Sequence, residues 1–183
     1  MPHIQLADGV PGIRSLAMYR PETGKPLYEL AQVLLRGESP LSQAERELIA
    51  TYVSAQNNCN FCTQSHAAAA RALFGPDRNV VDFVLSEYET APISEKLKDL
   101  LTIAGRVQMD ARTVSDEDVA RAREHGASDR DIHDTVLIAA TFCMFNRYVD
   151  GLSTLSPTDP AIYEPMGERL AQHGYAVPAN SPA

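Results

Sequence analysis

Two cysteines and a histidine lie at helical spacing about one third of the way along the chain. Cys62 follows Cys59 by three residues, and His66 follows Cys62 by four, which is the repeat of one helical face. At about 100° per residue, the three side chains fall within a stripe roughly 60° wide. Two thiols that face one imidazole base are the ingredients of a redox site, because a helix N-terminus stabilises thiolates and a Cys-x-x-Cys pair can close a short disulfide.

A carboxylate on the preceding segment can join this site. Residues 42–56 are predicted to form a helix that begins at Ser42 and carries Glu47. If this helix packs antiparallel to the one that carries the cysteines, the Glu47 carboxylate reaches the volume shared by the thiols and the imidazole. The apolar positions of the predicted helix are Ala44, Leu48, Ile49, Tyr52, Val53 and Ala55.

Zinc binding is the main alternative use of the same side chains. A Cys-x-x-Cys pair with a nearby histidine supplies three of the four ligands of a tetrahedral site, and Cys143, His133 or Glu47 would have to be the fourth. A second Cys-x-x-Cys pair is missing from the sequence. Covalent haem attachment requires a histidine where Thr63 stands. Cys143 by itself is interpreted as a small buried hydrophobe.

The other histidines have no such neighbours in the sequence. We interpret them as surface or packing residues, and Tyr52 as a core residue. These histidines are His3, His125, His133 and His173.

Length, cysteine content and charge narrow the class of protein. A chain of 183 residues is about one domain and can bury its core without disulfides. Three cysteines do not describe a secreted disulfide scaffold, and the first residues resemble no signal peptide, so we expect a cytoplasmic protein. With 24 acidic and 16 basic residues, the net charge of −8 and the scattered cations argue against nucleic-acid binding. No run of eighteen apolar residues occurs, and no membrane contact is expected.

Apolar periodicity and capping signals predict an all-α protein, a compact helical bundle without strands. The stretch up to Lys25 is predicted to be loop, because prolines and glycines break its pattern. Prolines interrupt the pattern again after residue 155, and the last five residues are expected to be disordered. The apolar side chains of 157–175 look poorly placed to extend the same bundle, which predicts self-association through the long apolar helices and this tail. The predicted helices span about 27–35, 42–56, 59–74, 77–88, 94–110, 115–125 and 128–148.

The combination of Glu47, eleven intervening residues and Cys59-x-x-Cys62-x-x-x-His66 resembles the alkyl hydroperoxidase D-like branch of the carboxymuconolactone decarboxylase family. The likeness extends more loosely over residues 25–155 and includes the sequence NRYVDGL at 146–152, which looks like the peroxidase-related members. The resemblance implies an all-α bundle that forms trimers or hexamers. It also implies a single domain over 1–183, with the family core at 25–155 and a C-terminal extension at 156–183.

The resemblance also implies roles for the four side chains. Cys62 would attack the peroxide and become a sulfenic acid, Cys59 would act as proton donor and resolving thiol, and His66 with Glu47 would form a proton relay. The prototype peroxidase has a histidine immediately before the second cysteine, where this chain has Phe61. The residues alone leave the nucleophile open: Cys59 lies nearer the helix N-terminus, whereas Cys62 lies one turn from an imidazole that can take its proton.

The expected function is therefore a thiol-dependent peroxidase that reduces alkyl hydroperoxides or hydrogen peroxide without a metal or cofactor. Its partner would be a reducing dithiol, either a protein or a lipoyl-type group. Two alternatives remain at this point. One is a lyase of the kind that gives the family its name, and the other is a non-enzymatic redox-sensing module.

Overall fold

The computed structural model describes residues 1–175 and confirms the all-α prediction, since this part of the chain contains helices and no strand. Three short 3-10 helices lie at Gly75–Asp77, Ala111–Thr113 and Pro160–Ile162. The α-helices are α1 (Gly12–Tyr19), α2 (Pro21–Arg36), α3 (Gln43–Gln56), α4 (Asn60–Phe74), α5 (Val80–Glu87), α6 (Glu95–Asp110), α7 (Asp116–Glu124), α8 (Asp129–Gly151) and α9 (Tyr163–His173).

Serine caps begin four of the helices where the sequence predicted them. Ser42, Ser115 and Ser128 form capping boxes at the starts of α3, α7 and α8, and Ser94 caps α6. Each cap satisfies backbone N–H groups that have no partner inside the helix. The ends of these helices are therefore fixed by local sequence.

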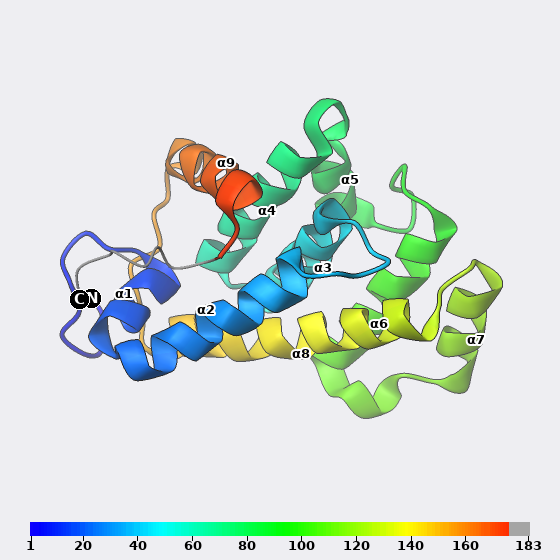
Figure 1. The fold of residues 1–183 in the computed structure, drawn as a ribbon, viewed down its shortest axis with the longest axis horizontal. Coiled ribbons are helices and arrows are strands. Elements are labelled where there is room, and N and C mark those ends of the chain that lie inside the picture. Colours follow the sequence, from blue (N-terminus) through cyan, green and yellow to red (C-terminus); the bar gives the residue numbers. More distant parts are fainter. Residues whose placement is uncertain (176–183) are drawn as a thin grey trace.

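The core is organised around α3, which contacts α4, α6 and α8. In Figure 1, α8 runs along the length of the molecule, α7 lies at one end, and α9 lies beside α4. Nine consecutive residues of α3, 46–54, are buried, so this helix has no solvent-facing side over most of its length. Any polar side chain on this stretch must find its partners inside the protein.

The N-terminal segment differs from the prediction, because α1 and the first turn of α2 occupy part of the stretch that was expected to be loop. Pro21 stands at the first position of α2, where a proline costs little because its missing N–H would have no partner. Gly12 begins α1 with a φ of +54°. Pro11, Gly12 and Pro21 therefore mark the starts of helices, and Gly24 lies inside α2.

The C-terminal segment also differs from the prediction, because α9 packs on α4 within the same chain. Gly167 lies so close to α4 that an added Cβ would be 2.4 Å from the carbonyl carbon of Ala68. Tyr163 and Leu170 are buried, so the view that this segment cannot extend the bundle is wrong. The last five residues lie outside the described part of the chain. No helix within residues 1–175 is both long and apolar enough to cross a membrane.

Candidate redox site

The two cysteines lie at the start of α4, directly after a sharp corner. Asn58 makes this corner in the left-handed conformation, with a φ of +57°. Cys59 is the residue immediately before the helix, and Cys62 lies in its first turn. Both side chains are buried and neither forms a disulfide. The local sequence therefore places two reduced thiols on the inner side of a helix N-terminus.

Cys59 is held as a protonated thiol. Its Sγ donates a hydrogen bond to Oδ1 of Asp150, 3.3 Å away in the last turn of α8. A hydrogen bond with Cys62 and then burial raise the pKa of Cys59 far above that of an ordinary thiol, and the charge of Asp150 adds to the effect. The site therefore disfavours Cys59 as the attacking thiolate, although Cys59 lies nearer the helix N-terminus.

His66 and Glu47 form the hydrogen-bonded pair that the sequence predicted. Nδ1 of His66 lies 2.7 Å from Oε2 of Glu47, and the Glu47 side chain is completely buried. Two further donors hold the second carboxylate oxygen: Nη2 of Arg36 at 2.6 Å and the hydroxyl of Tyr175 at 2.7 Å. The Tyr175 hydroxyl also lies 3.1 Å from Nδ1 of His66. Three helices and the segment after α9 thus meet at one carboxylate.

These partners decide the charge of Glu47. Burial by itself raises the pKa of the carboxyl group, but His66, Arg36 and Tyr175 together outweigh it, so the pKa of Glu47 lies below its ordinary value. Burial and the neighbouring charge of Glu47 raise the pKa of Tyr175 well above normal, which keeps its hydroxyl a donor. Because Glu47 is an acceptor, Nδ1 of His66 carries the proton and Nε2 is left as the basic nitrogen.

A small cavity of about 40 Å³ joins Cys62 and His66. A single water needs about 10–15 Å³ by such a measure, so the space suits a molecule of a few non-hydrogen atoms. Cys59 is not among the lining residues, so a reactant in the cavity meets Cys62 first. Apart from Cys62 and His66, the wall is largely apolar and aromatic. It consists of Ile13, Leu27, Tyr28, Ala31, Phe61, Phe142, Phe145 and Tyr175.

All four side chains predicted from the sequence lie in or beside this site, but three further residues were missed. Arg36 is the last residue of a helix in which the preceding Leu34 and Leu35 are buried. The only sequence signal for its contact with the site was therefore a charged residue next to an apolar stripe. Asp150 and Tyr175 reach the site from distant parts of the chain. Nothing in their local sequence indicates those contacts.

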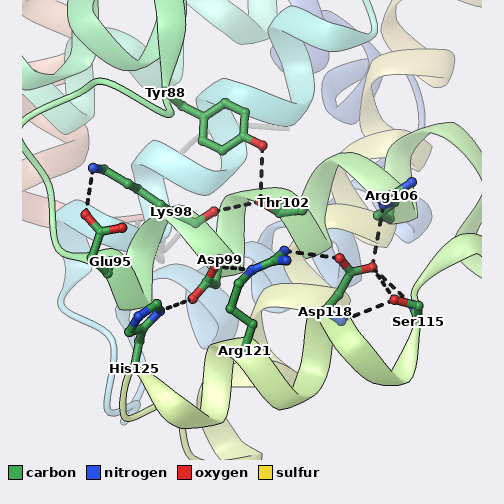
Figure 2. Close-up of polar contacts among 10 residues, drawn as sticks. All are labelled: Tyr88, Glu95, Lys98, Asp99, Thr102, Arg106, Ser115, Asp118, Arg121 and His125. Atoms are coloured by element: carbon green, nitrogen blue, oxygen red, sulfur yellow. Dashed lines mark hydrogen bonds and ion pairs between the residues drawn. The ribbon is translucent and has the colours of Figure 1, made fainter.

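Two histidines outside the site, His125 and His133, also have carboxylate partners that the sequence did not predict. Nδ1 of His133 lies 2.9 Å from Oδ1 of Asp134. Nδ1 of His125 lies 2.5 Å from Oδ2 of Asp99, and Nε of Arg121 donates to the other oxygen at 2.8 Å. Figure 2 shows Asp99 between these two side chains, and Asp118 between Arg121 and Arg106. The charged side chains of this cluster pair with one another between α6 and α7, so we interpret the cluster as a structural contact that holds these two helices together.

The zinc alternative finds little support in the geometry. Within residues 1–175, no three His, Cys, Asp or Glu side chains are grouped so that they could hold a metal ion. Glu47, one of the proposed fourth ligands, is already bonded to Arg36, His66 and Tyr175.

Comparison with known proteins links this site to one family. Residues 21–75, which include Glu47 and the cysteine motif, match the sequence model of the carboxymuconolactone decarboxylase family. A search of curated proteins finds no match.

Solved structures extend the likeness over most of the chain. An uncharacterized peroxidase-related protein from Silicibacter sp. TM1040 is 29% identical, with a TM-score of 0.76 over 85% of this chain and 79% of that one. An uncharacterized peroxidase-related protein from Ralstonia eutropha JMP134, described as an alkylhydroperoxidase AhpD core, is 27% identical, with a TM-score of 0.76 over 87% and 82%. A protein of unknown function from Agrobacterium tumefaciens, 22% identical, shares the fold with a TM-score of 0.70 over 87% and 100%. The predicted family resemblance is thus confirmed.

Proposed function

We propose, from the family pattern in residues 21–75 and the fold shared with peroxidase-related proteins, that this chain is a thiol-dependent peroxidase. The observation that carries the proposal is the cavity that presents Cys62 beside His66, with the buried Glu47 behind the imidazole. These residues supply a nucleophile, a base and a group that can orient the base.

The first half of the proposed cycle oxidises Cys62. Nε2 of His66 takes the thiol proton, and the Cys62 thiolate attacks one oxygen of a hydroperoxide ROOH. The O–O bond breaks, the alkoxide takes the proton from His66, and the products are ROH and a Cys62 sulfenic acid. Glu47 stabilises the imidazolium that exists between the two proton transfers.

The second half restores the thiols. Cys59 attacks the sulfur of the Cys62 sulfenic acid, water leaves, and a Cys59-Cys62 disulfide forms. A dithiol reductant, a protein or a lipoyl-type group, then reduces this disulfide and is itself oxidised. Such a reductant operates in a reducing compartment, and we therefore propose the cytoplasm.

We further propose that the protein is a homo-oligomer, a trimer or a hexamer. The C-terminal tail packs against its own chain. Leu137 and Met144, however, lie two turns apart on α8 and are 37% and 44% exposed. Large apolar side chains exposed along one face are typical of subunit contacts.

Three cysteine variants test the proposed chemistry. Cys62→Ser should abolish peroxide consumption, whereas Cys59→Ser should leave a dimedone-reactive sulfenic acid at Cys62, and Cys143→Ser should behave as wild type. Mass spectrometry after a brief peroxide pulse distinguishes these outcomes. Repeated consumption with dithiothreitol supports an enzyme, and one oxidation without turnover would instead indicate a redox sensor. Sulfenic acid at neither cysteine would remove peroxidase chemistry.

A further inference from the structure

We propose that Asp150 is a further catalytic residue, whose carboxylate takes the Cys59 proton when Cys59 attacks oxidised Cys62. This inference rests on the proposed peroxidase cycle and concerns its second half. The Cys59 thiol is fully buried and donates to Oδ1 of Asp150 at 3.3 Å. Within residues 1–175, Asp150 is the only carboxylate that is hydrogen-bonded to either thiol of the pair. A thiol must lose its proton to attack, and here the acceptor is already in contact with it.

The fold holds Asp150 at this distance through Asn146, one turn earlier on α8. Asn146 is buried, accepts a hydrogen bond from Nδ2 of Asn57 at 2.8 Å and donates one to Oγ of Ser54 at 3.1 Å. The backbone N–H of Cys59 donates to the carbonyl of Ser54 at 3.0 Å. The end of α8 is thereby tied to the corner that leads into Cys59, so these bonds fix the carboxylate relative to the thiol.

The geometry also provides an acceptor for the Cys59 proton and a route from that acceptor to solvent. Cys59 donates its thiol hydrogen to Asp150, so transfer of that proton to the carboxylate leaves a sulfur lone pair that can attack oxidised Cys62. In the proposed step the S–H bond of Cys59 and the S–O bond of the sulfenic acid break, and the S–S bond forms. The proton passes to Asp150 and from there to the departing hydroxide, which leaves as water. Asp150 is exposed on its outer side and so can exchange protons with solvent.

A single-turnover experiment separates the two halves of the cycle. Reduced protein is mixed with one equivalent of hydrogen peroxide, quenched at intervals, and analysed for sulfenic acid with dimedone and for disulfide by mass spectrometry. In Asp150→Asn, sulfenic acid should form at the wild-type rate, and its conversion to disulfide should slow by about 10²-fold, the lower end of general-base effects. Asp129→Asn, an exposed carboxylate at the other end of α8, is the matched control and should leave both rates unchanged.

Chemical rescue distinguishes proton transfer from a merely structural role. In Asp150→Ala, added formate should restore disulfide formation in proportion to its concentration, because a small carboxylate can enter the vacated, solvent-facing position. Disulfide formation at the wild-type rate in Asp150→Asn, or a slow variant that formate does not rescue, would overturn the role of Asp150 and leave the peroxidase proposal intact. Absence of both sulfenic acid and the Cys59-Cys62 disulfide in the wild-type protein would overturn both.

Discussion

Replacing Glu47 by glutamine tests the proton relay most directly, because it keeps the shape of the side chain and removes its charge. Glu47 presents Oε2 to His66 and Oε1 to Arg36 and Tyr175. Glutamine can keep its one oxygen toward the two donors, but its amide nitrogen then faces Nδ1 of His66. Two N–H donors cannot face each other, so His66 must move its proton to Nε2.

The tautomer change should lower the activity, and the lost charge should lower the stability. With the proton on Nε2, His66 can no longer take the Cys62 proton, and general-base catalysis of this kind is worth about 10²- to 10⁴-fold. Stability should fall by about 3 kcal/mol, because removing one partner of a buried ion pair leaves the Arg36 guanidinium uncompensated. Typical domains have about 5–15 kcal/mol of stability, so the variant should still fold.

The pH dependence of this stability difference has a defined sign. Because the pKa of Glu47 in the folded state lies below its ordinary value of 4.5, ionised Glu47 stabilises the fold. This contribution is complete above the unfolded pKa, declines below it, and is lost once the pH falls through the folded pKa. Urea unfolding should therefore show the largest gap between wild type and Glu47→Gln at neutral pH and a closing gap in acid.

Stopped-flow oxidation by hydrogen peroxide provides the rate, and Tyr175→Phe provides the control. The phenylalanine variant loses the 2.7 Å hydrogen bond but keeps the Glu47 charge and the ring that lies against His66. It should lose about 1.5–3 kcal/mol of stability and much less activity than Glu47→Gln. Wild-type oxidation rates in Glu47→Gln would refute the relay, and equal activity losses in both variants would show that packing around His66 matters more than its tautomer.

Three further predictions follow from the surroundings of the site. Oxidation should link Cys59 to Cys62 and leave Cys143 reduced, because the first pair shares one helix end; non-reducing peptide mapping that finds Cys143 in the main disulfide would contradict this. Gly12→Ala should destabilise the protein by about 1–3 kcal/mol, because the new Cβ would lie 2.0 Å from the Phe61 ring and the residue has a φ of +54°; thermal unfolding measures the loss, and an unchanged midpoint would count against this packing. Light scattering at micromolar concentration should give a trimer or hexamer, and a monomeric mass would refute the proposed assembly.

Local sequence predicted the parts of the fold that are determined locally. The capping serines and the apolar stripes identify most helices, because both signals act within a few residues. Glu47 and His66 could be paired from the sequence because the corner at 57–59 is short and forces α3 and α4 to lie side by side. Helical spacing and one assumption about packing were therefore sufficient for this part of the site.

Two of the three residues that were missed, Asp150 and Tyr175, depend on contacts between distant segments. Arg36, Asp150 and Tyr175 are separated from their partners in the site by 11, 91 and 128 positions. The prolines after residue 155 suggested an interrupted tail, yet Pro165 lies in the first turn of α9, where its missing N–H has no helical partner to lose. The close approach of Gly167 to Ala68 then brings the end of α9 over α4, so that Tyr175 reaches Glu47.

Phe61 shows how the local environment concentrates the proposed acid-base chemistry on one imidazole. This chain has Phe61 where the prototype peroxidase has a histidine. The Phe61 side chain is 4% exposed and lines the cavity. It fits against Gly12 and packs near Tyr163. An apolar residue there cannot donate or accept a proton, and His66 is the only imidazole among the residues that line the cavity. In the proposed cycle, proton transfer at Cys62 then depends on a single His66 tautomer. The two additional donors on Glu47, Arg36 and Tyr175, help to keep its carboxylate ionised, and an ionised acceptor favours the proton on Nδ1 of His66.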